Sequence, residues 1–197
     1  MRRTKIAVAL LSVFVLVCLS SPVRAAHSRH HRHHHARRGA RIDTLQPRAR
    51  ASFTAAVYDM RRQGIKPRVN STFRSTAQQR SIYHCAHRAS CRRRHGIYGA
   101  RRPGTSLHEA GLAVDLGGVA SGGKHRRRLT PRGRQMVRIM RRHGFDWKYG
   151  LKDPAHFEIS ARRAGYRTEK AAIRSGQAMH HSPGAPGAPG APTHRRV

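Results

Sequence analysis

Acidic residues are scarce in this sequence. Its 197 residues contain only 8 Asp and Glu against 41 Lys and Arg, and the formal net charge is +33. A surface this basic attracts polyanions such as nucleic acid, anionic lipid or acidic cell-wall polymer, which argues against an ordinary acidic or neutral small-molecule enzyme. The length excludes a large multidomain assembly and fits one domain with tails.

Long apolar runs are also missing. The apolar stretch at residues 6–19 has 14 residues, whereas a membrane-spanning helix needs about 20. It follows the basic segment MRRTK and precedes small residues that suit cleavage after Ala25 or Ala26, as in a secretory signal peptide. We expect residues 1–25 to be removed on export to the periplasm, cell wall or cell exterior, rather than kept as a signal anchor. Their removal lowers the net charge from +33 to +29 and leaves no transmembrane span in the mature chain.

Cysteines are few as well. Of the three in the chain, Cys18 lies in the predicted signal peptide, so Cys85 and Cys91 remain. An even number of cysteines in an exported protein predicts a disulfide between these two. The alternative is a metal site, since three histidines lie close by in the sequence, but no CxxC pair accompanies them.

Both ends of the chain have the composition of tails. Residues 26–41 contain six histidines and no apolar periodicity, which predicts a solvated segment that can hold zinc loosely. A metal scavenger is the function that this tail alone would suggest. Residues 166–197 include the repeat PGAPGAPGAP, which is typical of an extended spacer. The folded domain is therefore predicted over 42–165.

Within that range, helical and extended patterns alternate. Apolar residues at helical spacing predict a helix that stops near Gly64, and a Thr-Pro pair predicts the start of another helix at residue 130. Short apolar runs predict strands, of which the one at 112–116 is flanked by glycines and buried. This mixture favours an α+β fold with a small antiparallel sheet and flanking helices. The predicted helices cover about 53–63, 76–84 and 131–143, and the predicted strands cover 66–73, 112–116 and 155–159.

Half of the few acids are concentrated in two short segments that also hold histidines. The segments are SLHEAGLAVDLGG and DPAHFEI. Two histidines and one carboxylate make a three-ligand catalytic zinc site, and a second carboxylate can take a proton from water at the fourth position. Spacing alone leaves open that these are ordinary surface or core histidines. The residues concerned are His108, Glu109, Asp115, Asp153, His156 and Glu158.

SLHEAGLAVD matches the SxHxxGxAxD pattern of the VanY-like D-alanyl-D-alanine carboxypeptidases. These are zinc peptidases related in fold to lysostaphin and the hedgehog signalling domain. STFRSTAQQRSIY and WKYGLKDPAHFEI resemble the upstream and closing segments of the same family. The three segments have the family's order and together span about residues 70–160. The resemblance implies a hedgehog-like fold and an exported zinc peptidase that acts on peptidoglycan stem peptides, expected here to be a monomer.

The resemblance also implies roles for individual residues. His108, Asp115 and His156 become the zinc ligands. Asp153 becomes the general base, in the place where many family members have the glutamate of an ExxH sequence. Arg74 becomes the group that binds the substrate carboxylate or the developing oxyanion.

Several neighbouring residues are expected to support this site. Gln79, five residues after the arginine, is expected to contact substrate, and Ser106 either orients substrate or caps its loop. Trp147 is expected to pack beside the site. Glu109 and Glu158 are expected either to support the metal ligands from outside or to be structural partners of nearby arginines.

The exact bond stays open at this point. The DPAHFE ending resembles a branch of the family that includes phage endolysins cutting L-alanyl-D-glutamate bonds, while the FRSTAQQ segment fits the carboxypeptidases. A D-Ala-D-Ala carboxypeptidase is the leading interpretation, and an L-Ala-D-Glu endopeptidase is the alternative. From another class, a non-catalytic protein that binds anionic envelope polymers or nucleic acid also fits the charge. Specific nucleic-acid binding is disfavoured by the signal peptide and by the lack of an aromatic stacking platform.

Overall fold

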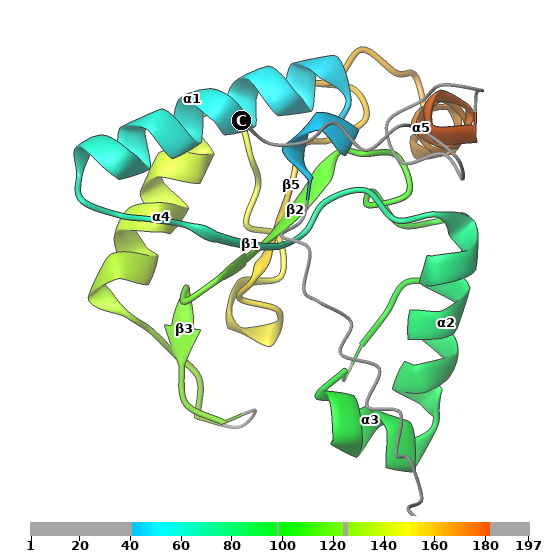
Figure 1. The fold of residues 1–197 in the computed structure, drawn as a ribbon, viewed down its shortest axis with the longest axis horizontal. Helices are drawn as coiled ribbons and strands as arrows, with labels where there is room; N and C mark the ends of the chain where they lie inside the picture. The colour runs from blue at the N-terminus through cyan, green and yellow to red at the C-terminus, as the bar shows by residue number, and fades with distance from the viewer. Residues whose placement is uncertain (1–40, 98, 124–125, 182–197) are drawn as a thin grey trace, which may run out of the picture. The chain divides into compact units, whose positions relative to one another are not determined.

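The computed structural model describes residues 41–97, 99–123 and 126–181 (Figure 1). The predicted signal peptide, the histidines of the predicted N-terminal tail and the Gly-Ala-Pro repeat lie outside the described residues. Within these ranges, no helix combines the length and the apolar character that a membrane crossing requires.

A three-stranded antiparallel sheet lies at the centre of the described chain. Its strands are β1 (Arg68–Ser71), β2 (Ala113–Gly117) and β5 (His156–Glu158), in the order β1-β2-β5. Antiparallel β3 (Ala120–Ser121) and β4 (Arg128–Leu129) form a separate two-stranded sheet. The observed sheet confirms the predicted α+β class, and all three predicted strands are present within a few residues of their expected bounds.

Two helices cover the core beside the sheet. The first is α1 (Pro47–Arg62), which buries three of the apolar residues that predicted it, Phe53, Ala56 and Met60. The second is α4 (Pro131–Arg142), which packs against α1 (Figure 1). Thr130 caps α4, because its hydroxyl oxygen accepts a hydrogen bond of 2.7 Å from the Gly133 amide. Short 3-10 helices η1 (Ile42–Thr44) and η2 (Gly150–Lys152) complete this part of the chain.

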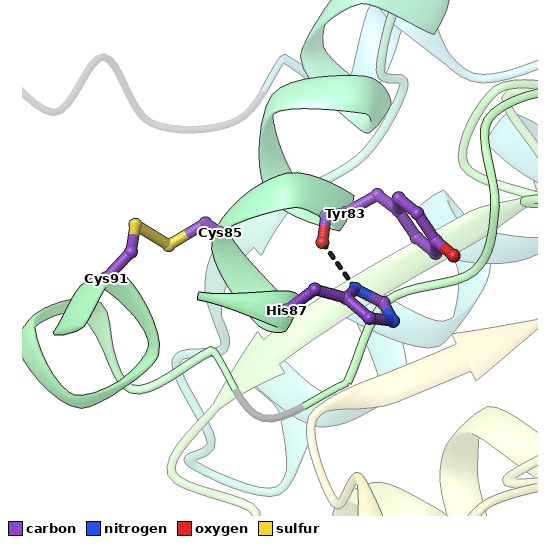
Figure 2. Close-up of a disulfide and its surroundings, with 4 residues drawn as sticks. All are labelled: Tyr83, Cys85, His87 and Cys91. Carbon is purple, nitrogen blue, oxygen red and sulfur yellow. Dashed lines mark hydrogen bonds between the residues drawn. A yellow bond between two sulfur atoms is a disulfide. The ribbon is translucent and has the colours of Figure 1, made fainter. Parts of the chain in front are cut away.

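The remaining predicted helix begins where the sequence places it. In α2 (Thr76–His87), a capping box joins Ser75 and Gln78 at the N-terminus. The arginine-rich segment that follows is helical, α3 (Ala89–His95), and the Cys85–Cys91 disulfide joins α2 to α3 across a Cα–Cα distance of 5.1 Å (Figure 2). The two cysteines therefore bind each other in the structure.

The predicted C-terminal boundary is wrong. Residues 169–181, expected to belong to a tail that begins at 166, form helix α5 (Glu169–His181), which buries Ala172 and Ile173. The apolar face of this helix is small, and the helix lies directly before the Gly-Ala-Pro repeat. The composition of this region therefore gives no clear signal for a helix. Burial against the rest of the domain, which a local pattern does not report, stabilises this helix.

We predict that the disulfide stabilises the α2–α3 pair without contributing to the chemistry of the chain. The double variant Cys85→Ser, Cys91→Ser is expected to lose about 2 kcal/mol of unfolding free energy, because without the disulfide the short loop between the two positions gains freedom in the unfolded state. Chemical denaturation measures the loss, and the intact mass of the exported wild type should be two hydrogens below that of the reduced form. An unchanged denaturation midpoint would contradict the prediction.

Candidate metal centre

Three potential metal ligands converge at the centre of the sheet. The Nε2 atom of His108 lies 3.2 Å from the Asp115 Oδ1 atom and 3.2 Å from the His156 Nδ1 atom, and the last two atoms are 3.3 Å apart. Within the described ranges, this is the one group of His, Cys, Asp or Glu residues whose ligand atoms gather closely enough to hold a metal ion. The two sequence segments predicted to form a site do meet.

Strand register brings two of the three ligands together. Asp115 lies on the middle strand, β2, and its direct partner on β5 is His156, while its partner on β1 is Ser71. Directly opposed residues of an antiparallel pair have Cβ atoms about 4.5–5.5 Å apart, so their side chains meet on one face.

The third ligand comes from a turn that precedes β2. The Ser106 hydroxyl oxygen accepts a hydrogen bond from the His108 amide, and the Glu109 carboxylate accepts hydrogen bonds of 3.0, 2.9 and 3.2 Å from the amides of Gly104 and Ser106. Gly111 ends the turn with a φ of 67°, a conformation that glycine adopts without strain. These bonds hold the turn in a shape that presents the imidazole to the sheet.

Hydrogen bonds on the far side of each imidazole fix which nitrogen faces the centre. Nδ1 of His108 donates to the Thr72 carbonyl oxygen at 2.6 Å, which leaves Nε2 as the ligand atom. Nε2 of His156 donates to the Glu158 carboxylate at 2.9 Å, which leaves Nδ1. Metal-binding histidines almost always have such partners, because the second bond orients the ring and makes the ligand nitrogen more basic. Two nitrogens and one carboxylate oxygen fit zinc.

The charges at the centre are strongly coupled. Burial opposes ionisation of Asp115, but His108, His156 and Arg74 outweigh it and hold the carboxyl pKa far below its usual value. Burial lowers the pKa of His108. Burial also opposes protonation of His156, yet its hydrogen bonds with the two neighbouring carboxylates raise its pKa to about 9. A metal that binds here must therefore displace a proton from His156, so binding strengthens as the pH rises.

Arg74 lies against the outer oxygen of the central carboxylate. Its Nη2 atom donates to Asp115 Oδ2, its Nε atom donates to the Ser71 hydroxyl oxygen at 2.9 Å, and its Nη1 atom donates to the Gln79 amide oxygen at 3.5 Å. Because Asp115 offers its other oxygen to the histidines, one carboxylate connects the arginine to the candidate metal position.

Asp153 is exposed and lies at the end of η2, three residues before His156. Loss of hydration and the negative charge of Asp115 raise the pKa of its carboxyl, although the two histidines partly offset the increase. All eight acids of the chain fall within the described residues, and Asp153 is the only exposed one among them that forms no ion pair there. In a chain with 41 basic residues, such a carboxylate is free to accept a proton.

Two side chains hold the loop that carries Asp153 by hydrogen bonds to its backbone carbonyl groups. The Trp147 indole nitrogen donates to the Pro154 carbonyl oxygen at 3.1 Å, so the tryptophan does pack beside the site as predicted. Arg127 donates to the Lys152 carbonyl oxygen at 2.6 Å.

Other predicted site residues lie behind the centre. Gln79 is 1% exposed and donates to the Arg101 carbonyl oxygen, and Ser106 is 4% exposed, so both support the site in this structure instead of lining it. Among the described residues, neither Glu109 nor Glu158 pairs with an arginine, and Glu158 takes the other expected role, that of supporting a candidate metal ligand. Glu109 accepts backbone hydrogen bonds, and Glu158 pairs with His156 and with Lys148 at 3.1 Å.

Sequence reasoning missed two participants. The Thr72 contribution is a backbone carbonyl, which leaves no side-chain signature in a sequence. The ring centroid of Tyr149 is 5.2 Å from that of His156, and a single tyrosine carries no sequence signal for such a contact. The spacing of His156 and Glu158 agrees with the expected supporting role of Glu158, because residues two apart on a strand share a face.

Comparisons with known proteins identify the family of this chain. The profile of the VanY family, described as D-alanyl-D-alanine carboxypeptidase, matches residues 42–163. A search among curated proteins finds no match. A solved structure that matches is the Zn(II) complex of a mutant of the vancomycin-resistance D,D-pentapeptidase VanY from a VanB-type resistance cassette, at 22% identity and a TM-score of 0.42, over 70% of this chain and 79% of that chain. The family match covers more than half of the chain and confirms the resemblance stated from the sequence.

We predict that the protein binds about one zinc ion tightly and that His108, Asp115 and His156 hold it. Each ligand changed to Ala should abolish tight binding, because a catalytic zinc site needs three protein ligands and the variant keeps two. Metal analysis after dialysis measures the content, and a chain without residues 26–41 controls for the histidine-rich tail. Full zinc retention in His108→Ala and His156→Ala would refute the assignment.

Proposed function

Because the chain belongs to the VanY family of D-alanyl-D-alanine carboxypeptidases, we propose that it is an exported zinc peptidase that removes the terminal D-alanine from peptidoglycan stem peptides. The observation that carries the proposal is the converged His-Asp-His group with an unpaired carboxylate, Asp153, beside it. A metal centre and a free base are the two parts that metal-assisted peptide hydrolysis requires.

The residues present fit zinc, with His108, Asp115 and His156 as ligands. When bound, zinc supplies a Lewis acid that polarises the scissile carbonyl and acidifies water. The hydrogen bonds to Thr72 and Glu158 keep both imidazoles in the tautomer that such binding needs.

Asp153 acts as the general base in this proposal. Its carboxylate takes a proton from the attacking water while the water oxygen forms a bond to the scissile carbonyl carbon. The same carboxyl then gives that proton to the amine nitrogen as the carbon–nitrogen bond breaks. Its raised pKa suits the role, because proton transfer in both directions is most efficient when the pKa lies closer to the working pH.

Arg74 recognises the terminal carboxylate of the substrate. Of the five N–H donors of its guanidinium, one on each nitrogen binds a described neighbour, namely Ser71, Gln79 and Asp115. One N–H therefore remains on each Nη atom, and a guanidinium with N–H groups free on both can bind a carboxylate through two hydrogen bonds. The contact with Asp115 also keeps this fork next to the metal position.

We predict that Asp153→Asn retains the fold and the zinc but lowers turnover by about 10² to 10⁴, the usual contribution of a positioned general base. The amide has nearly the same shape but does not accept a proton. Steady-state hydrolysis of a pentapeptide stem, with zinc content measured in parallel, checks this. An unchanged rate would mean that another group, such as Glu158, accepts the proton.

We predict that the enzyme releases free D-Ala from a pentapeptide stem but not from the same peptide with an amidated C-terminus. The amide removes the charge that Arg74 recognises. Arg74→Lys keeps the charge but not the fork, so kcat/KM on the acid should fall about 10-fold to 100-fold, as expected for a lost charge-assisted hydrogen bond. Mass spectrometry of the products identifies the bond. Cleavage of both peptides between L-Ala and D-Glu would overturn the carboxypeptidase assignment in favour of the endopeptidase.

A further inference from the structure

Helix α5 lies beyond residues 42–163, the range that the family profile matches. It nevertheless contacts both of the irregular segments that hold the metal centre. One is the segment Thr72–Arg74, which follows β1, and the other is the turn at 106–111, which precedes β2. We propose that α5 positions the metal centre and that Gln177 is the positioning residue through which it acts.

A single side chain connects the two segments. The Gln177 Nε2 atom donates to the Arg74 carbonyl oxygen at 3.1 Å and to the Glu109 carbonyl oxygen at 2.9 Å. Its Oε1 atom accepts a hydrogen bond of 3.2 Å from the Thr76 amide, at the first residue of α2. Glu109 adjoins the ligand His108 in sequence. Gln177 therefore fixes the backbone beside one ligand and the backbone of the arginine that binds another.

The preceding residue lets the helix come close enough for these bonds. A Cβ atom added to Gly176 would lie 2.7 Å from each of three backbone atoms of Ala110, so only glycine permits this approach. Figure 1 shows α5 beside the loop that leads into β2. The buried side chains of Ala172 and Ile173 hold this face of the helix against the domain.

A third contact is made near the end of α5. The His180 ring is stacked on the Phe73 ring with 3.7 Å between centroids, and its Nε2 atom donates to the Thr44 carbonyl oxygen at 2.8 Å. The Thr44 hydroxyl in turn bonds the Thr72 hydroxyl at 3.0 Å. Thr72 is the residue whose carbonyl orients the ligand His108. The helix thus contacts both neighbours of Phe73, directly at Arg74 and through Thr44 at Thr72.

These contacts matter because neither segment has a complete strand ladder or helix to hold it. Among the described residues, two hydrogen bonds link them directly: the Arg74 amide donates to the His108 carbonyl oxygen at 3.1 Å, and the His108 Nδ1 atom donates to the Thr72 carbonyl oxygen at 2.6 Å. Functional groups must be held within about 0.5 Å of their productive geometry. The side chain of Gln177 adds two hydrogen bonds to the same pair of segments.

The test compares Gln177→Leu with two controls in the full chain. Leu has a similar size but removes both donors. Arg174→Ala changes an exposed residue of the same helix, and Val137→Ala makes a small cavity in the core at α4, so it controls for lost stability. The measurements are the apparent zinc affinity, the visible spectrum of bound Co²⁺, the melting temperature and the values of kcat and KM on a pentapeptide stem.

We expect Gln177→Leu to weaken zinc binding at least about 10-fold, as loss of a residue that orients metal ligands typically does, and to change the Co²⁺ spectrum. Both controls should bind zinc within about twofold of wild type. Gly176→Ala, which pushes the helix away from the turn, should change metal binding in the same direction. Zinc affinity and a Co²⁺ spectrum in Gln177→Leu that match those of Val137→Ala would overturn the proposal, since a purely structural role predicts that equality.

The catalytic part of this inference rests on the proposed function, but the metal measurements do not. If the wild type binds zinc and cleaves no stem peptide, the proposed function fails while the effect of Gln177→Leu on zinc affinity still decides the inference. If the wild type is active and Gln177→Leu leaves metal binding, kcat and KM unchanged, the inference fails and the proposed function stands.

Discussion

The carboxylate of Asp115 is the interaction on which the rest of the site depends. One of its oxygens faces both histidines, and the other accepts a hydrogen bond from Arg74. A carboxylate that is largely buried is stable in its charged form only when such partners surround it. The same charge contributes to the raised pKa of His156, together with Glu158, and to the raised pKa of Asp153, together with loss of hydration. In the proposed function, metal binding, base strength and substrate recognition would therefore share one anionic centre.

The distribution of acids follows from this arrangement. Glu109 and Glu158 are 0% and 4% exposed, and they hold a backbone turn and an imidazole. Glu109 makes no ion pair among the described residues, while Glu158 also pairs with the exposed Lys148. With two of the 8 acids buried against 41 Lys and Arg, few carboxylates remain to offset the basic surface.

Much of the site was predictable from sequence because its chemistry depends on rare residue types. With only 8 acids in the chain, the two segments that combine acids and histidines stood out, and the structure brings them together. The supports were harder to find. The carbonyl of Thr72 belongs to the backbone, Gln177 lies about 70 residues from the ligand His108 in sequence, and Gly176 matters only because Ala110 approaches it. The strands and α1 followed from local periodicity, whereas α5 depends on tertiary burial that no local pattern reports.

Because β2 is the middle strand of the sheet, its position also determines where insertions and deletions in this chain can be tolerated. Side chains alternate along a strand, so a one-residue insertion or deletion before Asp115 within β2 would turn that carboxylate to the opposite face of the sheet. No local adjustment of β1 or β5 restores the meeting of ligands, because both pair with the same strand. The α2–α3 pair can tolerate a change in length more easily. Its disulfide joins the two helices to each other, and no candidate metal ligand lies between them. Natural variants of this fold should therefore vary in length around α3 and hold the spacing between His108 and Asp115 constant.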